Sequence, residues 1–246
     1  MHRPTPLRAG WAACLAGFAL MLTQAPAQAS SGDYAQLLTL YREWRALERP
    51  SLRDGAPDYT AATVAARFEQ LRQQQARLAA IDPAGWPREQ RIDHELVRAQ
   101  MNGMEFDTRW LRPWARDPAF YQSIWTEQSD TPEHEGPTHH APVELWQYSF
   151  PLDAAAERKL AGELQGVAPL LEQARLNLTG DGHDLWLTGT ATMQQQVANL
   201  EELAQKTAAG GPELRRAVAA ASVATREFVG WLERQAPAKT GPSGIG

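Results

Sequence analysis

Apolar residues recur at intervals of three, four and seven along most of this chain, and that periodicity limits the fold more than any other feature. The clearest stripe is Leu160, Leu164, Val167, Leu170, Leu171, Ala174 and Leu178. Such spacing places side chains on one face of an α-helix. No stretch shows a convincing strand pattern, and no internal repeat is visible. The sequence therefore predicts an all-α protein, an irregular multi-helix bundle of six to eight helices.

The expected helices are separated by proline and glycine. Asp33 and Asp184 are the predicted N-caps of two of them, and Pro169 is expected to kink or restart the helix that contains it. The third helix is expected to begin near Pro87 and to carry a stripe of Ile92, Leu96, Ala99, Phe106 and Trp110. The predicted ranges are 33–47, 64–81, 87–110, 153–178, 184–208 and 212–232.

The helical pattern fails over a long aromatic loop, from about residue 112 to residue 151. Six prolines and a cluster of aromatic residues fall in or beside it. This composition is too aromatic for a disordered linker, and long irregular segments in compact domains are often functional. We expect an ordered loop across the bundle, with one short helix over 118–125.

The N-terminus has the pattern of a secretory signal peptide over residues 1–29. Arg3 and Arg8 precede an apolar run from Ala9 to Leu22, and Ala27-Gln28-Ala29 provides small residues for cleavage. The run contains Cys14, the chain's single cysteine, in a poor context for lipid attachment. We expect an exported protein, periplasmic or secreted after cleavage near Ala29, without a disulfide or a cysteine nucleophile.

The charge of the mature chain argues against nucleic acid as a partner. The signal contains two of the 24 basic residues and no acidic one, which leaves 22 basic against 29 acidic residues, a formal charge of −7. The basic residues form no stripe. No segment after the signal is apolar enough to predict a membrane span.

The segment PEHEGPTHHAPVELW, residues 132–146, comes close to the zinc-protease signature H-E-x-x-H. That signature needs two histidines four positions apart on one helix. Here His134 and Glu135 are followed by His139 at the fifth position, and Gly136-Pro137 forbids the helix. The segment is therefore predicted to be a loop. The candidate residues for contact with a substrate or another domain are Asp130, His134, Glu135, His139, His140 and Trp146.

Three interpretations of this loop remain open: a native metal site, a contact surface, or structural hydrogen bonding. A second His-Glu pair, His94-Glu95, lies on a predicted helix. Its fourth-position partner is Arg98, which cannot bind a metal, so we interpret His94 as part of a charged, solvated helix face.

Several stretches together resemble the N-terminal half of a bacterial family, domain of unknown function 885. They are YREWRALERP, LRQQQARLAAIDPAGWPREQRIDHELVRAQM, QSDTPEHEGPTHHAPVELWQY and QARLNLTGDGHDLWL. Members of that family are regarded as exported, mostly helical zinc metallopeptidases of the gluzincin type, similar to carboxypeptidase Taq. Their zinc helix lies in the C-terminal half, and no residue of this chain matches it.

The resemblance implies a division into the signal peptide (1–29), a helical N-terminal domain (30–236), and a linker (237–246) to a missing C-terminal catalytic half. It implies no catalytic or metal residue in this chain, with zinc and a peptide substrate belonging to the parent enzyme. The face that would meet the missing half should then be an exposed apolar patch. The alternative is a complete periplasmic binding or chaperone-like module, with the tryptophan-rich loop as its ligand surface.

Overall fold

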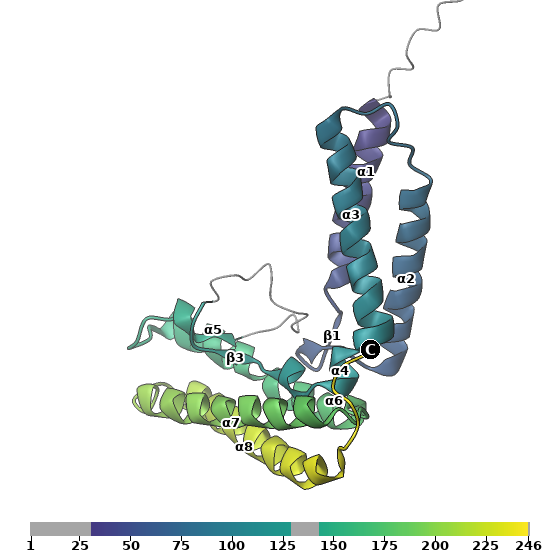
Figure 1. The fold of residues 1–246 in the computed structure, drawn as a ribbon. Helices are drawn as coiled ribbons and strands as arrows, with labels where there is room; N and C mark the ends of the chain where they lie inside the picture. Colours follow the sequence, from purple (N-terminus) through teal and green to yellow (C-terminus); the bar gives the residue numbers. More distant parts are fainter. Residues whose placement is uncertain (1–30, 129–142, 246) are drawn as a thin grey trace, which may run out of the picture.

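A computed structural model describes residues 31–128 and 143–245, and these residues form two helical layers (Figure 1). Three long helices stand upright: α1 (Ser31–Glu48), α2 (Ala61–Ala79) and α3 (Arg88–Phe106). Four more lie across their lower end: α5 (Ala154–Leu164), α6 (Val167–Asn177), α7 (His183–Lys206) and α8 (Pro212–Gln235). The predicted all-α class is confirmed.

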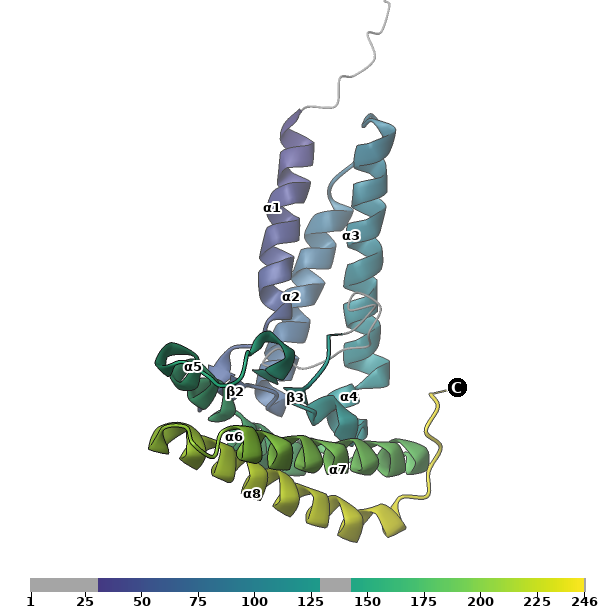
Figure 2. The same cartoon turned by 90° about the vertical axis from the view of Figure 1, so that its left-hand side faces the viewer.

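The upright bundle encloses a small core. α1 and α3 flank α2 in Figure 2, and the three helices pack around a short set of buried side chains. At the upper end of the bundle, the Tyr34 and Trp86 rings pack edge to face with 5.6 Å between their centroids. The buried apolar members are Leu37, Leu40, Trp44, Leu71, Leu78, Trp86, Val97 and Met101.

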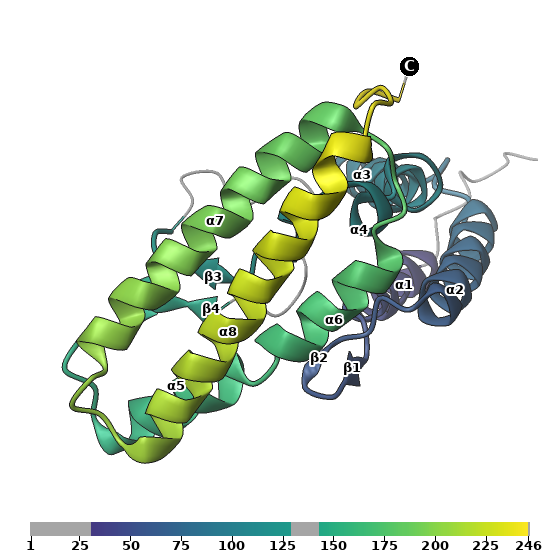
Figure 3. The same cartoon turned by 90° about the horizontal axis from the view of Figure 1, so that it is seen from below.

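The lower layer has the larger core. α8 lies between α7 and the α5–α6 pair, and it contacts all three (Figure 3). Trp186 and Phe228 are completely buried there, with Trp231 packed against both rings. The predicted helix over 153–178 is two helices in the structure, since it breaks at Gln165-Gly166 and Pro169 lies in the first turn of α6. Asp153 caps α5 by accepting from the Ala155 and Ala156 amides at 2.9 and 2.8 Å.

The aromatic segment contains more structure than predicted. A π-helical turn η1 (Asp107–Leu111) continues α3, and α4 (Pro113–Arg116) follows it. The short helix expected over 118–125 is a 3₁₀ turn η2 (Pro118–Tyr121) followed by strand β3 (Ile124–Trp125). β3 pairs in parallel with β4 (Val143–Glu144), and a second 3₁₀ turn η3 (Leu145–Gln147) comes next. Two-residue strands of this kind leave no periodicity to detect.

A hairpin and a polar clamp join the two layers. β1 (Leu52–Arg53) and β2 (Ala56–Pro57) pair antiparallel around Asp54-Gly55, both with positive φ, as an Asp-Gly type I′ turn requires. Gln173 of α6 accepts from the Tyr59 amide at 3.0 Å and donates to the Pro57 carbonyl at 3.1 Å. Gly166, just before α6, lets that helix approach the β1–β2 turn closely, because a Cβ at Gly166 would lie 2.8 Å from the Gly55 carbonyl oxygen.

The C-terminal residues fold back across the beginning of α7. After a 3₁₀ turn η4 (Ala236–Ala238), Gly241 donates to the Asp181 carbonyl at 2.8 Å. Ser243 Oγ accepts from the Asp184 and Leu185 amides at 2.8 and 3.3 Å. The predicted cap of α7 is therefore wrong: Asp184 lies inside the helix, and the serine that caps it comes from 59 residues further along.

Two other local predictions are corrected. α1 begins at Ser31, so Asp33 lies within the helix rather than at its N-cap. His94 does not lie on a solvated face, because its side chain is only 9% exposed. It packs inside the upright bundle, where its ring meets Trp86 edge to face at 6.1 Å between centroids.

The third helix forms as expected, but its orientation differs from the usual rule for an amphipathic helix. Its buried residues are His94, Val97 and Met101. The predicted stripe of larger apolar side chains faces outwards: Ile92, Leu96, Phe106 and Trp110 are all exposed. The spacing predicted a helix correctly and could not say which face the bundle would use.

Candidate functional site

The predicted contact loop lies mostly outside the described residues. Asp130, His134, Glu135, His139 and His140 fall in the segment 129–142, of which the structure gives no account. Of the six candidates, only Trp146 is described. It lies in η3 and is 38% exposed, so its indole is accessible to a partner.

The strand before that segment, β3, is held on α7 by one buried side chain, and β4 after the segment pairs with β3. Gln196 Oε1 accepts from the Ser123 amide at 2.7 Å and from the Ile124 amide at 3.1 Å, while its Nε2 donates to Thr225 of α8 at 3.3 Å. The Val143 amide then donates to the Ser123 carbonyl at 2.6 Å. Because Gln196 is completely buried, these bonds are shielded from water. The base of the loop is therefore fixed.

A small polar hollow lies beside this base. Its volume is about 300 Å³, and its lining includes Glu127, Leu145, Phe150, Glu202 and Lys206. The Lys206 ammonium lies 5.5 Å from the centroid of the Phe150 ring and 2.7 Å from the Glu202 carboxylate. Since Lys206 is already paired with Glu202, the described lining of the hollow offers no unpaired cation to a ligand.

Tyr148 lies close by and donates to Glu163 at 2.7 Å. Burial and the neighbouring carboxylate both raise the pKa of the Tyr148 phenol. The hydroxyl is therefore a neutral donor at physiological pH and is unsuited to act as a base. Lys159 completes a structural cluster, with its ammonium 5.0 Å from the Tyr148 ring centroid and 3.5 Å from Glu163.

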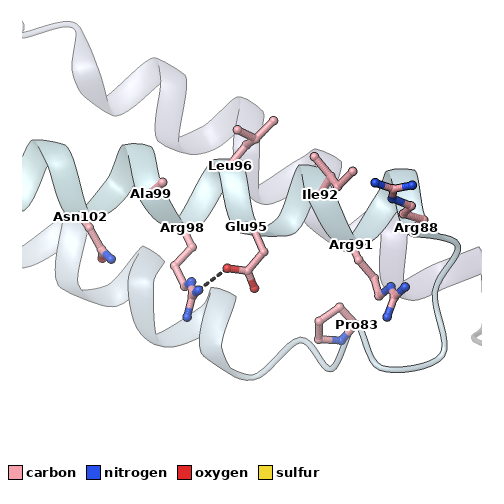
Figure 4. Close-up of a pocket in the computed structure, with 9 residues that line it drawn as sticks. All are labelled: Pro83, Arg88, Arg91, Ile92, Glu95, Leu96, Arg98, Ala99 and Asn102. Atoms are coloured by element: carbon pink, nitrogen blue, oxygen red, sulfur yellow. Dashed lines mark hydrogen bonds and ion pairs between the residues drawn. The ribbon is translucent and has the colours of Figure 1, made fainter.

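A larger hollow lies on the outer face of α3 (Figure 4). Its volume is about 690 Å³, within the range of small-molecule and peptide sites. Ile92, Leu96 and Ala99 provide the apolar part, and the Arg88 and Arg91 guanidinium groups lie at one end. Arg98 pairs with Glu95, whereas the side chains of Arg88 and Arg91 have no ion pair or hydrogen bond among the described residues.

The described residues do not provide a metal site. Over 31–128 and 143–245, no group of three or more His, Cys, Asp or Glu side chains could hold a metal ion. His94 Nδ1 has no hydrogen-bond partner there, and its nearest carboxylate oxygen, on Glu95, is 3.7 Å away. Its Nε2 lies 3.4 Å from the Leu78 carbonyl. These contacts are typical of a core histidine rather than a ligand.

Within residues 31–128 and 143–245, no helix combines the length and the apolar character that a membrane span needs.

The sequence did not indicate the Gln196 anchor or the orientation of the α3 stripe. A glutamine in the sequence QQQVANL has no local signal for burial, because its partners at Ser123 and Ile124 are more than 70 residues away.

Comparison with known protein families shows to which family the chain belongs. A model of a bacterial protein family of unknown function, DUF885, matches residues 44–244. The chain belongs to this family. Curated proteins give no match.

A solved structure has a similar fold, described as "a putative lipoprotein of unknown function from Shewanella oneidensis". The two share 16% identity with a TM-score of 0.54, so the likeness concerns the fold alone. The aligned part covers 84% of this chain and 36% of the other. The chain thus spans about a third of the length of that structure.

Proposed function

We propose that this chain is the N-terminal, non-catalytic part of an exported zinc metallopeptidase, in which it serves as scaffold and as one wall of the substrate cleft. The observation that carries the proposal is the coverage: the fold matches most of this chain but about a third of a larger structure. The family match over residues 44–244 supports membership of the family. The peptidase chemistry is what the sequence resemblance implies.

The zinc of such an enzyme would be held outside the described residues, which lack a suitable donor set. When bound, it would polarise a peptide carbonyl and activate water. The contribution of this chain would be a rigid wall. Gln196 fixes β3 before the 129–142 segment, and Trp146 lies four residues after that segment with an accessible indole. We propose that this loop faces the peptide substrate.

Peptide hydrolysis by two purified products tests the proposal. Residues 30–246 should show no peptidase activity with zinc, whereas the product of the reading frame extended past Gly246 should hydrolyse peptides. A chelator should abolish that activity, and added zinc should restore it. Chelator-sensitive hydrolysis by residues 30–246 would contradict the proposal. A stop codon directly after Gly246, together with specific ligand binding by the loop, would favour the binding module instead.

A third outcome concerns the histidines of the loop. If His134, Glu135, His139 and His140 hold a metal themselves, residues 30–246 should bind Zn²⁺, and alanine at those positions should remove the binding. Isothermal titration calorimetry without a zinc signal would exclude that interpretation. The proposal expects no such signal.

A further inference from the structure

The outer face of α3, together with the η1 turn that continues it, is an apolar surface that nothing in the described structure covers. Ile92, Leu96, Phe106 and Trp110 are 47%, 55%, 45% and 59% exposed. Ala99 and Gly103 lie between them on the same stripe and are also exposed. Scattered apolar residues on a surface are ordinary, but a continuous stripe along one helix indicates a contact surface. The small residues at its centre would let a neighbouring helix approach closely.

Two of the charged side chains beside this stripe lack a partner of opposite charge among the described residues. Arg88 and Arg91 line the hollow of Figure 4 and have no acidic partner among the described residues, while Glu95 is already paired with Arg98. Two arginines beside an apolar surface favour an occupant that brings carboxylates of its own. The face therefore fits a polypeptide with apolar side chains flanked by acidic ones.

Ser243 and Gly244 are held near the lower end of this face. Arg116 of α4 donates to the Ser243 carbonyl at 2.8 Å and to the Gly244 carbonyl at 3.4 Å. α4 begins three residues after Trp110, the last member of the stripe. Figure 2 shows the C-terminal residues rising past the beginning of α7 towards the lower end of α3. A polypeptide continuing from Gly246 would therefore start beside the stripe.

We infer that the outer face of α3 is the docking surface for the polypeptide that follows Gly246 in the full-length protein. The inference depends on the proposed function in one respect, that the chain continues. The occupant covers Ile92, Leu96, Phe106 and Trp110 and places carboxylates near Arg88 and Arg91. α3 then has two buried faces, one in the upright bundle and one against the remainder of the protein.

Hydroxyl-radical footprinting of residues 30–246 and of the extended product tests this inference. Labelling of Trp110 and Leu96 should fall several-fold in the extended product. Val223 of α8, which belongs to the lower layer and is 48% exposed, is the matched internal control and should be labelled equally in both. Equal labelling of Trp110 and Leu96 in the two products would overturn the inference.

Substitution of the face provides the second arm. In the extended product, the double change Ile92→Glu and Leu96→Glu should restore the labelling of Trp110, whereas Val223→Glu should leave Trp110 protected. If Trp110 stays protected in the double variant, the polypeptide that covers it does not bind through Ile92 and Leu96. If dilution alone raises Trp110 labelling in residues 30–246, a second copy is the occupant. Either result contradicts the inference.

The outcomes separate this inference from the proposed function. Protection of Trp110 without zinc-dependent hydrolysis supports docking and contradicts the peptidase. Hydrolysis without protection does the opposite. A reading frame that stops at Gly246 removes the occupant and overturns both.

Discussion

The two layers of this molecule differ in how their helices are held, although both are packed from the same residue types. The lower layer surrounds α8 on three sides, and Gln196 adds buried hydrogen bonds to its large apolar core. Among the described residues, the upright bundle has eight buried apolar side chains, and α3 exposes Ile92, Leu96 and Phe106. The comparison indicates that the lower layer has the larger buried core, whereas the bundle exposes an apolar stripe along α3 that is suited to a further partner.

The most damaging change should be Trp186→Ala in the lower layer. The indole is completely buried, and its removal should cost about 3–5 kcal/mol of unfolding free energy. Urea denaturation followed by circular dichroism measures the loss. Leu176→Ala, at a side chain 81% exposed, is the control and should change the stability by less than about 0.5 kcal/mol. Similar losses for both variants would mean that the lower core is not the main source of stability.

Gln196→Leu should come next, at about 2–4 kcal/mol, because it leaves the buried Ser123 and Ile124 amides without an acceptor. Limited proteolysis between β3 and β4 should also accelerate, since the strand pair loses its anchor on α7. The neighbouring Gln195→Leu is the control, because Gln195 is exposed and bonds only to Asn199. Unchanged proteolysis in Gln196→Leu would show that the strands hold the loop without the glutamine.

Two adjacent residues of α3 test the orientation of that helix. Val97 is 7% exposed and Leu96 is 55% exposed. Val97→Ala should destabilise residues 30–246 by about 1–3 kcal/mol, whereas Leu96→Ala should cost less than about 0.5 kcal/mol. Thermal or urea unfolding distinguishes the two. The reverse ranking would place the predicted stripe in the core and remove the proposed docking face.

Ser243→Ala tests the strap across α7 and should cost about 0.5–2 kcal/mol, the usual value of a helix N-cap. Amide hydrogen exchange of Asp184 and Leu185 should rise at the same time, because their acceptor is lost. Thr39→Ala, at an exposed hydroxyl on α1, serves as the control. Unchanged exchange at both amides would mean that water replaces the serine at no cost.

The smallest effect is expected at Asp107, where burial raises the pKa of the carboxyl. The folded state then binds the proton more tightly than the unfolded state, so the charged form costs stability at neutral pH. That cost disappears as the pH falls below the ordinary range of an aspartate. Asp107→Asn should be more stable than the parent at pH 7 by less than about 1 kcal/mol, since the group is partly solvated. An equal difference at pH 3 would exclude this cause.

Much of the fold could be predicted because helices are local. The breaks at Asp82-Pro83 and Gly210-Gly211 separate helices as the sequence indicates, and Asp153 caps α5. β3 and β4 could not be predicted, since their pairing joins residues almost 20 positions apart. The β3 side of the pair also depends on Gln196, which is more than 70 positions away. Of the candidate site, only Trp146 lies among the described residues, so the interpretation of its histidines stays a prediction.

The sequence by itself determined which segments are helical, because the spacing of apolar residues and the helix-ending prolines and glycines act within one turn. It also excluded the zinc-protease helix at His134, since Gly136-Pro137 follows directly. Only the tertiary structure decided that His94 is buried and Leu96 exposed, that Gln196 anchors the distant strand β3, and that Ser243 caps α7. Each of these depends on residues brought together by packing, which no local pattern records.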